Sequence, residues 1–253
     1  MILIKKNEEI DIMREAGKIL SLIRKELVNY LKPGISTFEL DIIASNLMKK
    51  YNVVSAFKGY KNFICYTCIS INEVVVHGVP SKKKFLNLGD IITLDLGIKF
   101  KGYYVDSAWT YYLGKISDNK KKFIQDTQQA LFEGIKKVKP GNHISDISIA
   151  ISKIGILNKY GIIEVFTGHG IGTSLHEPPN IFNFDFTKKD FFLEKDYVLK
   201  KGMTFCIEPM FTLGSKEIKI LSDGWSAVTI DSSLSAHFEH TVLVTENGYE
   251  ILT

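Results

Sequence analysis

The feature that most constrains the fold is an internal repeat between the two halves of the chain. The motif KPGIS at residues 32–36 has a counterpart at residues 139–145, which begin with KPG and end in serine. In each half a carboxylate also follows six residues after a glycine, Asp95 after Gly89 and Glu208 after Gly202. The sequence therefore predicts a duplicated fold whose pseudo-two-fold axis brings the two carboxylates together at its centre.

Hydrophobic periodicity and turn residues divide the chain into helical and strand segments. Apolar spacing predicts helices over about 8–31, 37–50, 118–138 and 145–159, and the Pro-Gly breaks follow the first and third of them. Apolar stretches predict strands at 63–78, 90–112, 163–168, 203–213, 225–230 and 236–252. This order indicates an α+β fold in one domain over residues 1–253, with halves of about 1–115 and 116–253.

The composition is that of a globular protein. The 253 residues are 45% hydrophobic and 24% charged, which is enough for a sizeable core. The longest apolar runs fall far short of the roughly eighteen residues that a membrane span needs. Lysines and glutamates follow directly after the four apolar residues at the start, so this start resembles neither a signal peptide nor an anchor. We therefore expect no membrane association and a cytoplasmic location.

The charge pattern argues against a DNA-binding function. The net charge is +4, and Arg14 and Arg24 are the only arginines, whereas proteins that read DNA rely on arginine forks. Lysines cluster at residues 82–84, 120–122 and 136–137. Such clusters are typical of solvated surface, and the alternative is a weak contact with an anionic partner such as ribosomal RNA.

Three cysteines cannot all pair, and nothing marks the chain as secreted, so we expect reduced thiols. Cys65 and Cys68 form a C-x-x-C motif, which can indicate a redox or zinc site. The residues around Cys68 are typical of a strand rather than of a helix start, and no second C-x-x-C follows. We therefore do not expect a redox or zinc site at this pair.

Five potential metal ligands lie in apolar or glycine-bounded stretches, and these residues are Asp95, Asp106, His169, Glu208 and Glu239. An ionised carboxylate cannot stay buried without a partner, so several of them together indicate a shared cation. One imidazole and four carboxylates, with no thiolate among them, make a hard and oxygen-rich ligand set. A histidine between glycines is more often a loop residue, and the assignment of His169 therefore depends on the carboxylates.

Asp95 and Asp106 flank a predicted turn at residues 99–102. If the pairing is centred between Phe100 and Lys101, the two aspartates are direct cross-strand neighbours with Cβ atoms about 5 Å apart. A bulge at Gly102 would instead shift the register by one residue. In the first case the two carboxylates repel each other unless a divalent ion lies between them.

Several motifs closely resemble type I methionine aminopeptidase. They are ISINEVVVHGVP at residues 69–80, GHGIG at 168–172, HEP at 176–178, IEPM at 207–210 and SAHFEHT at 235–241. The resemblance runs in order from Ile10 to Thr253 and is to the short, bacterial-type form without an N-terminal zinc-finger extension. It implies the pita-bread fold, in which pseudo-symmetric halves of helices and antiparallel sheet surround a dinuclear metal site. The internal repeat agrees with this fold.

The family holds two divalent ions with two aspartates, one histidine and two glutamates, and all five positions match here. The resemblance implies that Asp106 and Glu239 bridge both ions, that Asp95 completes one ion, and that His169 and Glu208 complete the other. Glu208 is also the implied base that takes a proton from the attacking water. Manganese, iron, cobalt and zinc all suit this ligand set, so the sequence does not name the metal.

The resemblance also assigns roles to two further histidines and to a pocket. From the residues alone, His77 and His176 favour a structural role, whereas the resemblance implies that His77 contacts the scissile amide nitrogen and His176 stabilises the developing oxyanion. The other implied pocket residues are Tyr60, Phe63, Cys68, Leu175 and Trp225. Aromatic and sulfur-containing walls suit a methionine side chain because they are polarizable and adaptable. Without the family, these residues would be interpreted as core.

Some positions depart from the family pattern. Gly97 stands where the family usually has a threonine that is thought to hold a metal-bound water, and Val105 stands where glycine is usual. Leu175 replaces an aromatic pocket wall, and the segment around residues 183–195 is longer than usual. None of these residues is a predicted ligand, so we expect activity to survive. Loss of supporting interactions can still cost roughly ten- to hundred-fold in metal affinity or rate.

The sequence therefore predicts a metalloaminopeptidase that removes the N-terminal methionine of nascent chains, preferably before a small second residue. One alternative is a peptidase of the aminopeptidase P or prolidase type, which shares the five ligands but usually carries an extra N-terminal domain. A second alternative is a non-catalytic, ribosome-associated binder on the same fold. Such proteins typically lose ligands, and this chain retains all five.

Overall fold

The computed structural model describes residues 2–188 and 195–253. Its helices are α1 (Asn7–Val28), α2 (Thr37–Lys50), α3 (Asp118–Ile135) and α4 (Ile144–Asn158), with short 3-10 helices η1 (Tyr60–Asn62) and η2 (Phe186–Lys188). Its strands are β1 (Val54–Ser55), β2 (Cys68–Ile71), β3 (Val74–Val76), β4 (Ile91–Phe100), β5 (Tyr103–Tyr112), β6 (Gly161–Ile162), β7 (Gly168–Gly170), β8 (Glu177–Ile181), β9 (Thr204–Ile207), β10 (Met210–Thr212), β11 (Ile218–Ile220), β12 (Ala227–Thr229), β13 (Ser235–His237), β14 (His240–Val244) and β15 (Tyr249–Ile251).

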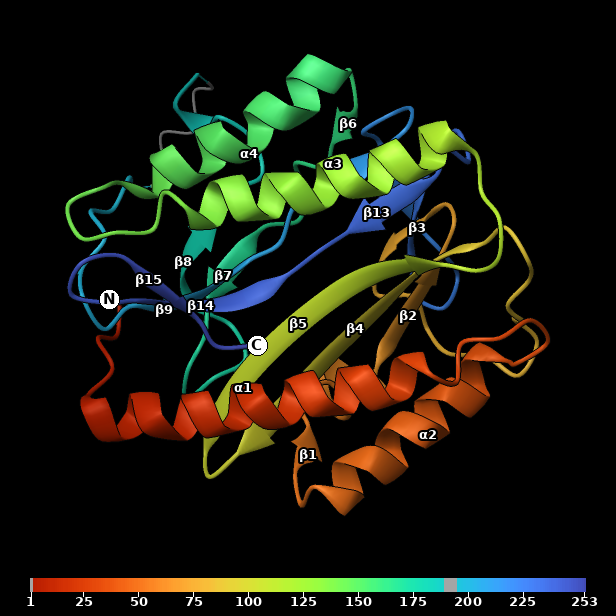
Figure 1. Ribbon diagram of the computed structural model, residues 1–253, viewed down its shortest axis with the longest axis horizontal. Coiled ribbons are helices and arrows are strands. Elements are labelled where there is room, and N and C mark those ends of the chain that lie inside the picture. The colour runs from red at the N-terminus through yellow and green to blue at the C-terminus, as the bar shows by residue number, and fades with distance from the viewer. Residues whose placement is uncertain (1, 189–194) are drawn as a thin grey trace.

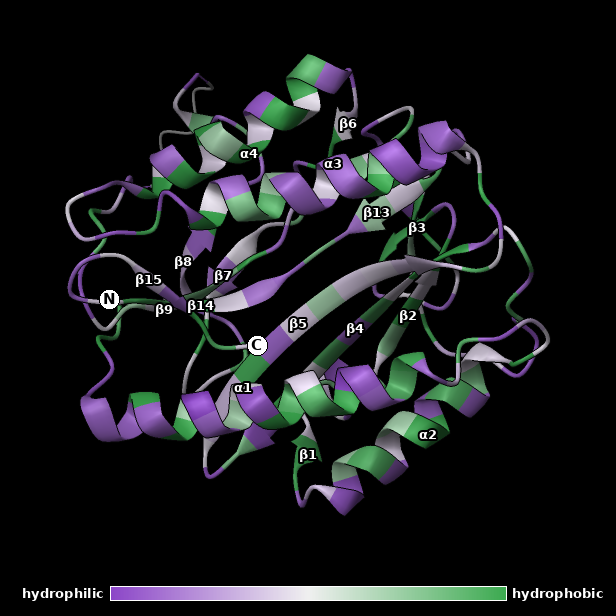
Figure 2. Ribbon diagram, viewed as in Figure 1, coloured by the Kyte–Doolittle hydropathy of each residue, from purple (hydrophilic) through white to green (hydrophobic). Residues whose placement is uncertain are grey.

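The two helix pairs enclose the strands. In Figure 1, α1 and α2 lie along one side of the molecule, α3 and α4 lie along the opposite side, and the strands lie between them. Helix α1 follows its apolar spacing, because Met13, Leu20 and Leu27 are fully buried and the helix packs on β4 and β5. Hydrophilic residues alternate with apolar ones along the helices in Figure 2, as expected of amphipathic elements. The architecture is the predicted α+β fold.

The internal repeat of the sequence is reproduced in the backbone hydrogen bonds. The N–H of Gly34 donates to the carbonyl of Leu86, and the N–H of Gly141 donates to the carbonyl of Leu199. The N–H of each leucine in turn donates to the carbonyl of the residue after the glycine, Ile35 in the first half and Asn142 in the second. Both glycines have positive φ, 85° and 90°, a conformation that glycine adopts without steric cost. In each half, therefore, the Pro-Gly break is a turn that holds the second helix beside the approach to a central strand.

The strands of the described ranges form four antiparallel sheets, two of which meet at the centre. One contains β1, β4, β2 and β5, and another has the order β15-β14-β9-β7-β8. Strand β5 joins them, because the N–H of Asp106 donates to Thr241 Oγ1, which donates to the carbonyl of Asp106, both at 2.9 Å. The N–H of Glu239 also donates to the carbonyl of Ala108 at 2.7 Å. The carboxylate-bearing segments of the two halves are thus held together by direct bonds.

The β4–β5 hairpin has a different register from the expected one. Asp95 lies opposite Ala108 and Asp106 lies opposite Gly97, so the expectation of direct Asp95–Asp106 pairing was wrong. The turn is the two-residue pair Lys101-Gly102, with φ of 47° and 92°, and no bulge is present. Positive φ at both central residues is typical of a type I′ turn, which matches the twist of the strands. The two aspartates are therefore diagonal neighbours on one face rather than opposite each other.

Two of the predicted strands differ from the structure. The segment 163–168 is not a strand, because β6 ends at Ile162 and β7 begins at Gly168, and the residues between them leave the sheet to line a cavity. The predicted strand 63–78 begins only at Cys68. Strand β8 was not predicted, since its two prolines disfavour sheet in a sequence reading.

None of the described helices is long and apolar enough to cross a membrane. The division into halves near residue 115 stays a prediction.

Candidate metal centre

The five predicted ligands converge from separate segments of the chain. Asp95 and Asp106 come from β4 and β5, His169 from β7, Glu208 from the link after β9, and Glu239 from the link between β13 and β14. One carboxylate oxygen from each of Asp95, Asp106 and Glu239 lies within 4.8 Å of the others. Nε2 of His169 lies 3.6 Å from Oε1 of Glu208. All five side chains line one cavity of about 380 Å³.

The carboxylates of this cluster are unfavourable in their ionised form unless a cation balances them. Burial, and then the charge of Asp106, raises the pKa values of Asp95, Glu208 and Glu239 well above the ordinary range. Burial also raises the pKa of Asp106 to about 7. Within residues 2–188 and 195–253, none of the four forms an ion pair with lysine or arginine. A divalent ion would reverse this repulsion and hold all four ionised.

The remaining geometry fits a metal ion. Oδ1 of Asp95 is buried and has no hydrogen-bond partner in the part of the chain that the structure describes. Nδ1 of His169 lies 3.0 Å from the carbonyl of Gly170, and a carbonyl only accepts, so Nδ1 carries the proton. The lone pair of His169 Nε2 is thereby turned toward Glu208 and the cluster. An imidazole oriented in this way and a carboxylate oxygen without a protein donor are both suited to ligation.

Two cysteines, which the sequence analysis did not place at the centre, lie beside it. Sγ of Cys206 lies within 4.8 Å of ligand atoms of His169 and Glu239, and Cys68 lies opposite Asp95 in the β2–β4 ladder. Burial, followed by the nearby carboxylates, raises the pKa of both thiols well above the ordinary value. Each thiol therefore favours its protonated form in this structure. Cys65, Cys68 and Cys206 are free and buried, so the C-x-x-C pair forms no disulfide.

His77 and His176 lie on the cavity wall beside the ligand cluster. The ring centroid of His176 is 4.1 Å from that of His169, and the His77 ring lies 5.1 Å from that of Phe166. Burial lowers the pKa of each of these two histidines to about 4, so both are neutral near pH 7. His77 has a φ of 59°, in the left-handed region that is uncommon for residues other than glycine, although histidine adopts it more readily than most. Backbone conformations of this kind cluster at functional sites.

The predicted pocket residues all lie on the same cavity wall. They are Tyr60, Phe63, Cys68, Leu175 and Trp225. Phe63 and Trp225 meet edge to face with centroids 5.0 Å apart, and Tyr60 lies 5.1 Å from the ring of His176. Phe57, Val76, Val165 and Phe166 also line the cavity, although the sequence analysis did not single them out. The result is an apolar recess that opens onto the carboxylate cluster.

The departure at Gly97 has a structural counterpart in Phe57. Gly97 lies opposite Asp106, on the face of β4 that carries Asp95. A Cβ at this position would lie 2.6 Å from Cε1 of Phe57, so the aromatic ring occupies the space of the side chain that the family usually has here. Val105 is fully buried and points to the opposite face of β5, away from the ligands. Part of the longer segment, residues 189–194, lies outside the described residues.

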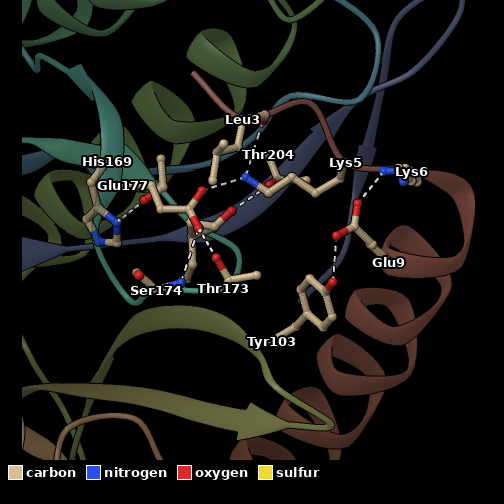
Figure 3. Close-up of polar contacts among 12 residues, drawn as sticks. Leu3, Lys5, Lys6, Glu9, Tyr103, His169, Thr173, Ser174, Glu177 and Thr204 are labelled. Carbon is tan, nitrogen blue, oxygen red and sulfur yellow. Dashed lines mark hydrogen bonds and ion pairs between the residues drawn. The ribbon is translucent and has the colours of Figure 1, made fainter. Parts of the chain in front are cut away.

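A buried ion pair anchors the loop that carries His176, as Figure 3 shows. Nζ of Lys5 lies 2.6 Å from Oε2 of Glu177, and both side chains are 5% exposed. The other oxygen of Glu177 accepts from Thr173 Oγ1 at 3.2 Å and from Ser174 N at 3.1 Å. Burial alone would raise the pKa of Glu177, but the hydrogen bonds from Lys5 and Ser174 outweigh it and lower the pKa. The segment before α1 is therefore part of the framework of the site.

Comparison with known proteins identifies the class to which this fold and site belong. The model of metallopeptidase family M24 matches residues 11–246, a range that includes all five clustered ligands. A buried group of four carboxylates and one oriented imidazole is the expected site of such a metal-dependent hydrolase.

Individual relatives narrow this class. Methionine aminopeptidase 1 of Bacillus subtilis (strain 168) is 44% identical over 253 residues, which cover 100% of this chain and 99% of the relative. Methionine aminopeptidase of Escherichia coli (strain K12) is 40% identical, over 99% of this chain and 93% of the relative. The crystal structure of the Thermotoga maritima methionine aminopeptidase matches with a TM-score of 0.94 at 39% identity and covers 100% of this chain and 99% of that one. The chain therefore belongs to the methionine aminopeptidases of metallopeptidase family M24.

A more distant neighbour shares the same architecture. The prolidase of Pyrococcus furiosus matches with a TM-score of 0.78 at 26% identity, over 99% of this chain and 65% of that chain. Together with the aminopeptidase structures, it confirms the predicted pita-bread fold.

Proposed function

We propose that this protein removes the N-terminal methionine from nascent proteins and peptides, with a preference for a small second residue. The observation that carries the proposal is the apolar recess of aromatic and sulfur-containing side chains directly beside the carboxylate cluster. Such a recess suits an unbranched thioether, because polarizable walls adapt to it. The relatives of highest identity quoted above are named for the same activity, whereas the prolidase neighbour is less similar in both sequence and structure.

We further propose that the metal-dependent site holds two divalent ions, of manganese, iron, cobalt or zinc. The arrangement of candidate ligand atoms supports this number. Asp95, Asp106 and Glu239 form one set, and His169, Cys206 and Glu239 form another. Glu208 Oε1 also lies 3.6 Å from His169 Nε2. By family resemblance, Asp106 and Glu239 would be shared by the two ions, Asp95 would hold one of them, and His169 and Glu208 would hold the other. When bound, such ions polarise the substrate carbonyl and lower the pKa of an attacking water toward about 7.

The chain's own residues carry out the remaining steps of the proposed mechanism. Glu208 accepts the proton of the attacking water and returns it to the leaving amine. His77 contacts the scissile amide nitrogen, and neutral His176 donates a hydrogen bond to the developing oxyanion. Tyr60, Phe63, Cys68, Leu175 and Trp225 hold the methionine side chain, and the apolar wall excludes water around it. This assignment rests on the matched motifs and on the position of each group around one cavity.

The proposed surroundings follow from the substrate. Nascent chains present their N-termini in the cytoplasm, and we propose that compartment as the site of action, consistent with three free, buried cysteines. A weak contact with the ribosome stays a prediction, based on the lysine clusters at residues 82–84, 120–122 and 136–137.

A direct assay tests the proposed substrate class. We expect the metal-loaded protein to release methionine from Met-Ala-Ser and to leave an Ala-Pro peptide intact. The peptides Met-Ala-Ser and Met-Leu-Ser, compared by kcat/KM, test the preference for a small second residue. Preferential turnover of Ala-Pro would support the prolidase-type alternative, and turnover of neither peptide with any of the four metals would support a non-catalytic binder.

Leu175 gives a prediction about the selectivity of the pocket. Leucine is smaller and more flexible than an aromatic ring, so we expect selectivity for methionine over norleucine or leucine to be relaxed. Leu175→Phe should sharpen it, because one methylene difference in a pocket is worth roughly 1–3 kcal/mol. The measurement is kcat/KM for Met-Ala-Ser, norleucine-Ala-Ser and Leu-Ala-Ser in both forms. Unchanged ratios of kcat/KM among the three peptides would show that Leu175 does not contribute to the selectivity of the pocket.

A further inference from the structure

His237 is a buried histidine beside the centre that lies within the SAHFEHT motif but has no role in the proposed mechanism. Its side chain is 2% exposed, and its Nε2 lies 3.6 Å from Oε2 of Glu208. Neither ring nitrogen has a hydrogen-bond partner among the residues that the structure describes. Buried imidazole nitrogens in folded proteins almost always have a partner, so the position of this ring requires an explanation.

The backbone at His237 is held firmly, so the direction of its side chain is fixed by the sheet. Strand β13 pairs with β10, and His237 lies opposite Met210, two residues after Glu208. The N–H of His237 donates to Thr110 Oγ1 at 3.0 Å, and its carbonyl accepts from the same hydroxyl at 2.7 Å. The backbone of His237 is therefore satisfied by Thr110, and only the ring remains without a partner.

Glu208 lies between two imidazoles, one at each carboxylate oxygen. His169 Nε2 is 3.6 Å from Oε1, and His237 Nε2 is 3.6 Å from Oε2. The proton on Nδ1 of His169 is fixed by Gly170, so the Nε2 lone pair of His169 serves a cation and not Glu208. Of the two imidazoles beside Glu208 in the described part of the chain, His237 is thus the one in a position to donate to the carboxylate. A small rotation of either side chain shortens the gap to hydrogen-bond length.

We propose that His237 is a positioning residue for Glu208. Its Nε2–H donates to Oε2 of Glu208, which keeps Oε1 directed at the ion that His169 also holds. A carboxylate anchored at one oxygen loses less rotational freedom on ligation, so Oε1 stays oriented toward the cluster. The inference rests on the proposed role of Glu208 as a metal ligand and adds a residue to that role.

His240 offers a matched control. It is also buried, at 4% exposure, and lies three residues from His237. Its Nδ1 is 3.0 Å from Thr253 Oγ1, and its ring packs against Trp109, so it has a partner outside the metal centre. Replacement of His240 tests what the loss of a buried histidine does to the fold alone.

The experiment measures binding of Mn(II) to the metal-free protein by calorimetry for the wild type, His237→Leu, His237→Gln and His240→Gln. Glutamine places its amide nitrogen where imidazole has Nε2, so it retains the donor, whereas leucine fills the space without one. We expect His237→Leu to weaken Mn(II) binding by roughly ten- to hundred-fold, as for other residues that orient metal ligands. His237→Gln and His240→Gln should stay within a few-fold of the wild type.

The outcomes separate this inference from the proposed function. Wild-type protein that binds no Mn(II) would contradict the metal-centre assignment itself. If the wild type binds and His237→Leu binds equally well, the positioning role is excluded. If His237→Leu does not fold, the comparison of His237→Gln with His240→Gln decides. Weak Mn(II) binding by His237→Gln but not by His240→Gln would contradict the proposal, because glutamine retains the donor that Glu208 is proposed to need. Rescue by glutamine, together with loss in the leucine variant, supports the proposal.

Discussion

Removal of bound metal by exhaustive chelation should abolish hydrolysis of Met-Ala-Ser, and Mn(II), Co(II) or Fe(II) should restore it. The physical reason is the cost of the metal-free site, in which four carboxylates converge without a lysine or arginine partner among the described residues. Burial raises the pKa of each of these groups, and the charge of Asp106 raises the pKa values of Asp95, Glu208 and Glu239 further. Without the cation, the site cannot hold the ionised carboxylates and loses its means of activating water.

Elemental analysis with activity measurement checks this result. Full activity in protein from which no metal remains would contradict the metallohydrolase mechanism. Asp106→Asn preserves the shape of the side chain but removes its charge, so it should lose metal and turnover together. Asp41→Asn is the matched control, because Asp41 is equally buried but accepts three hydrogen bonds from Tyr66 and Thr67. This variant should lower thermal stability while it leaves the metal content unchanged.

The repeat could be predicted from the sequence because it depends on local patterns, and the five candidate ligands, which line one cavity, stand in recognisable motifs. The Pro-Gly turns at Gly34 and Gly141 require positive φ, and this requirement is visible as a glycine in each motif. The α2 helix begins where predicted because Ser36 and Glu39 form a capping box, a signal contained within four residues. Features of this kind can be read from a single sequence.

What the sequence did not predict depends on contacts between distant segments. The predicted register of the β4–β5 hairpin was wrong because Lys101, which is not a glycine, adopts the left-handed conformation that the turn requires. The Lys5–Glu177 pair joins residues 172 positions apart, and neither residue differs in its local pattern from an exposed one. Phe57 at the cavity and His237 beside Glu208 likewise resemble core residues until the sheets bring them to the centre. A single sequence carries no signal for such pairings.

Replacement of His77 or His176 should lower turnover of Met-Ala-Ser by roughly 10²-fold or more while the metal content stays at the wild-type level. Removal of one positioned donor at a developing oxyanion costs about this much in other enzymes. Both histidines line the cavity beside the ligands, but their rings are not among the groups of ligand atoms that cluster there. Burial lowers the pKa of each to about 4, so each presents a neutral ring to the substrate.

The choice of variants follows from the backbone. His77 has a φ of 59°, which alanine adopts with strain, whereas asparagine tolerates this region. His77→Asn therefore removes the imidazole with little backbone cost, and a similar loss in His77→Ala and His77→Asn would assign the effect to the ring. His143→Ala is a surface control, since His143 lies at the N-cap of α4 with a side chain 47% exposed. Loss of metal in either site variant would show that the histidine is a ligand, and wild-type turnover would show that it does not act on the substrate.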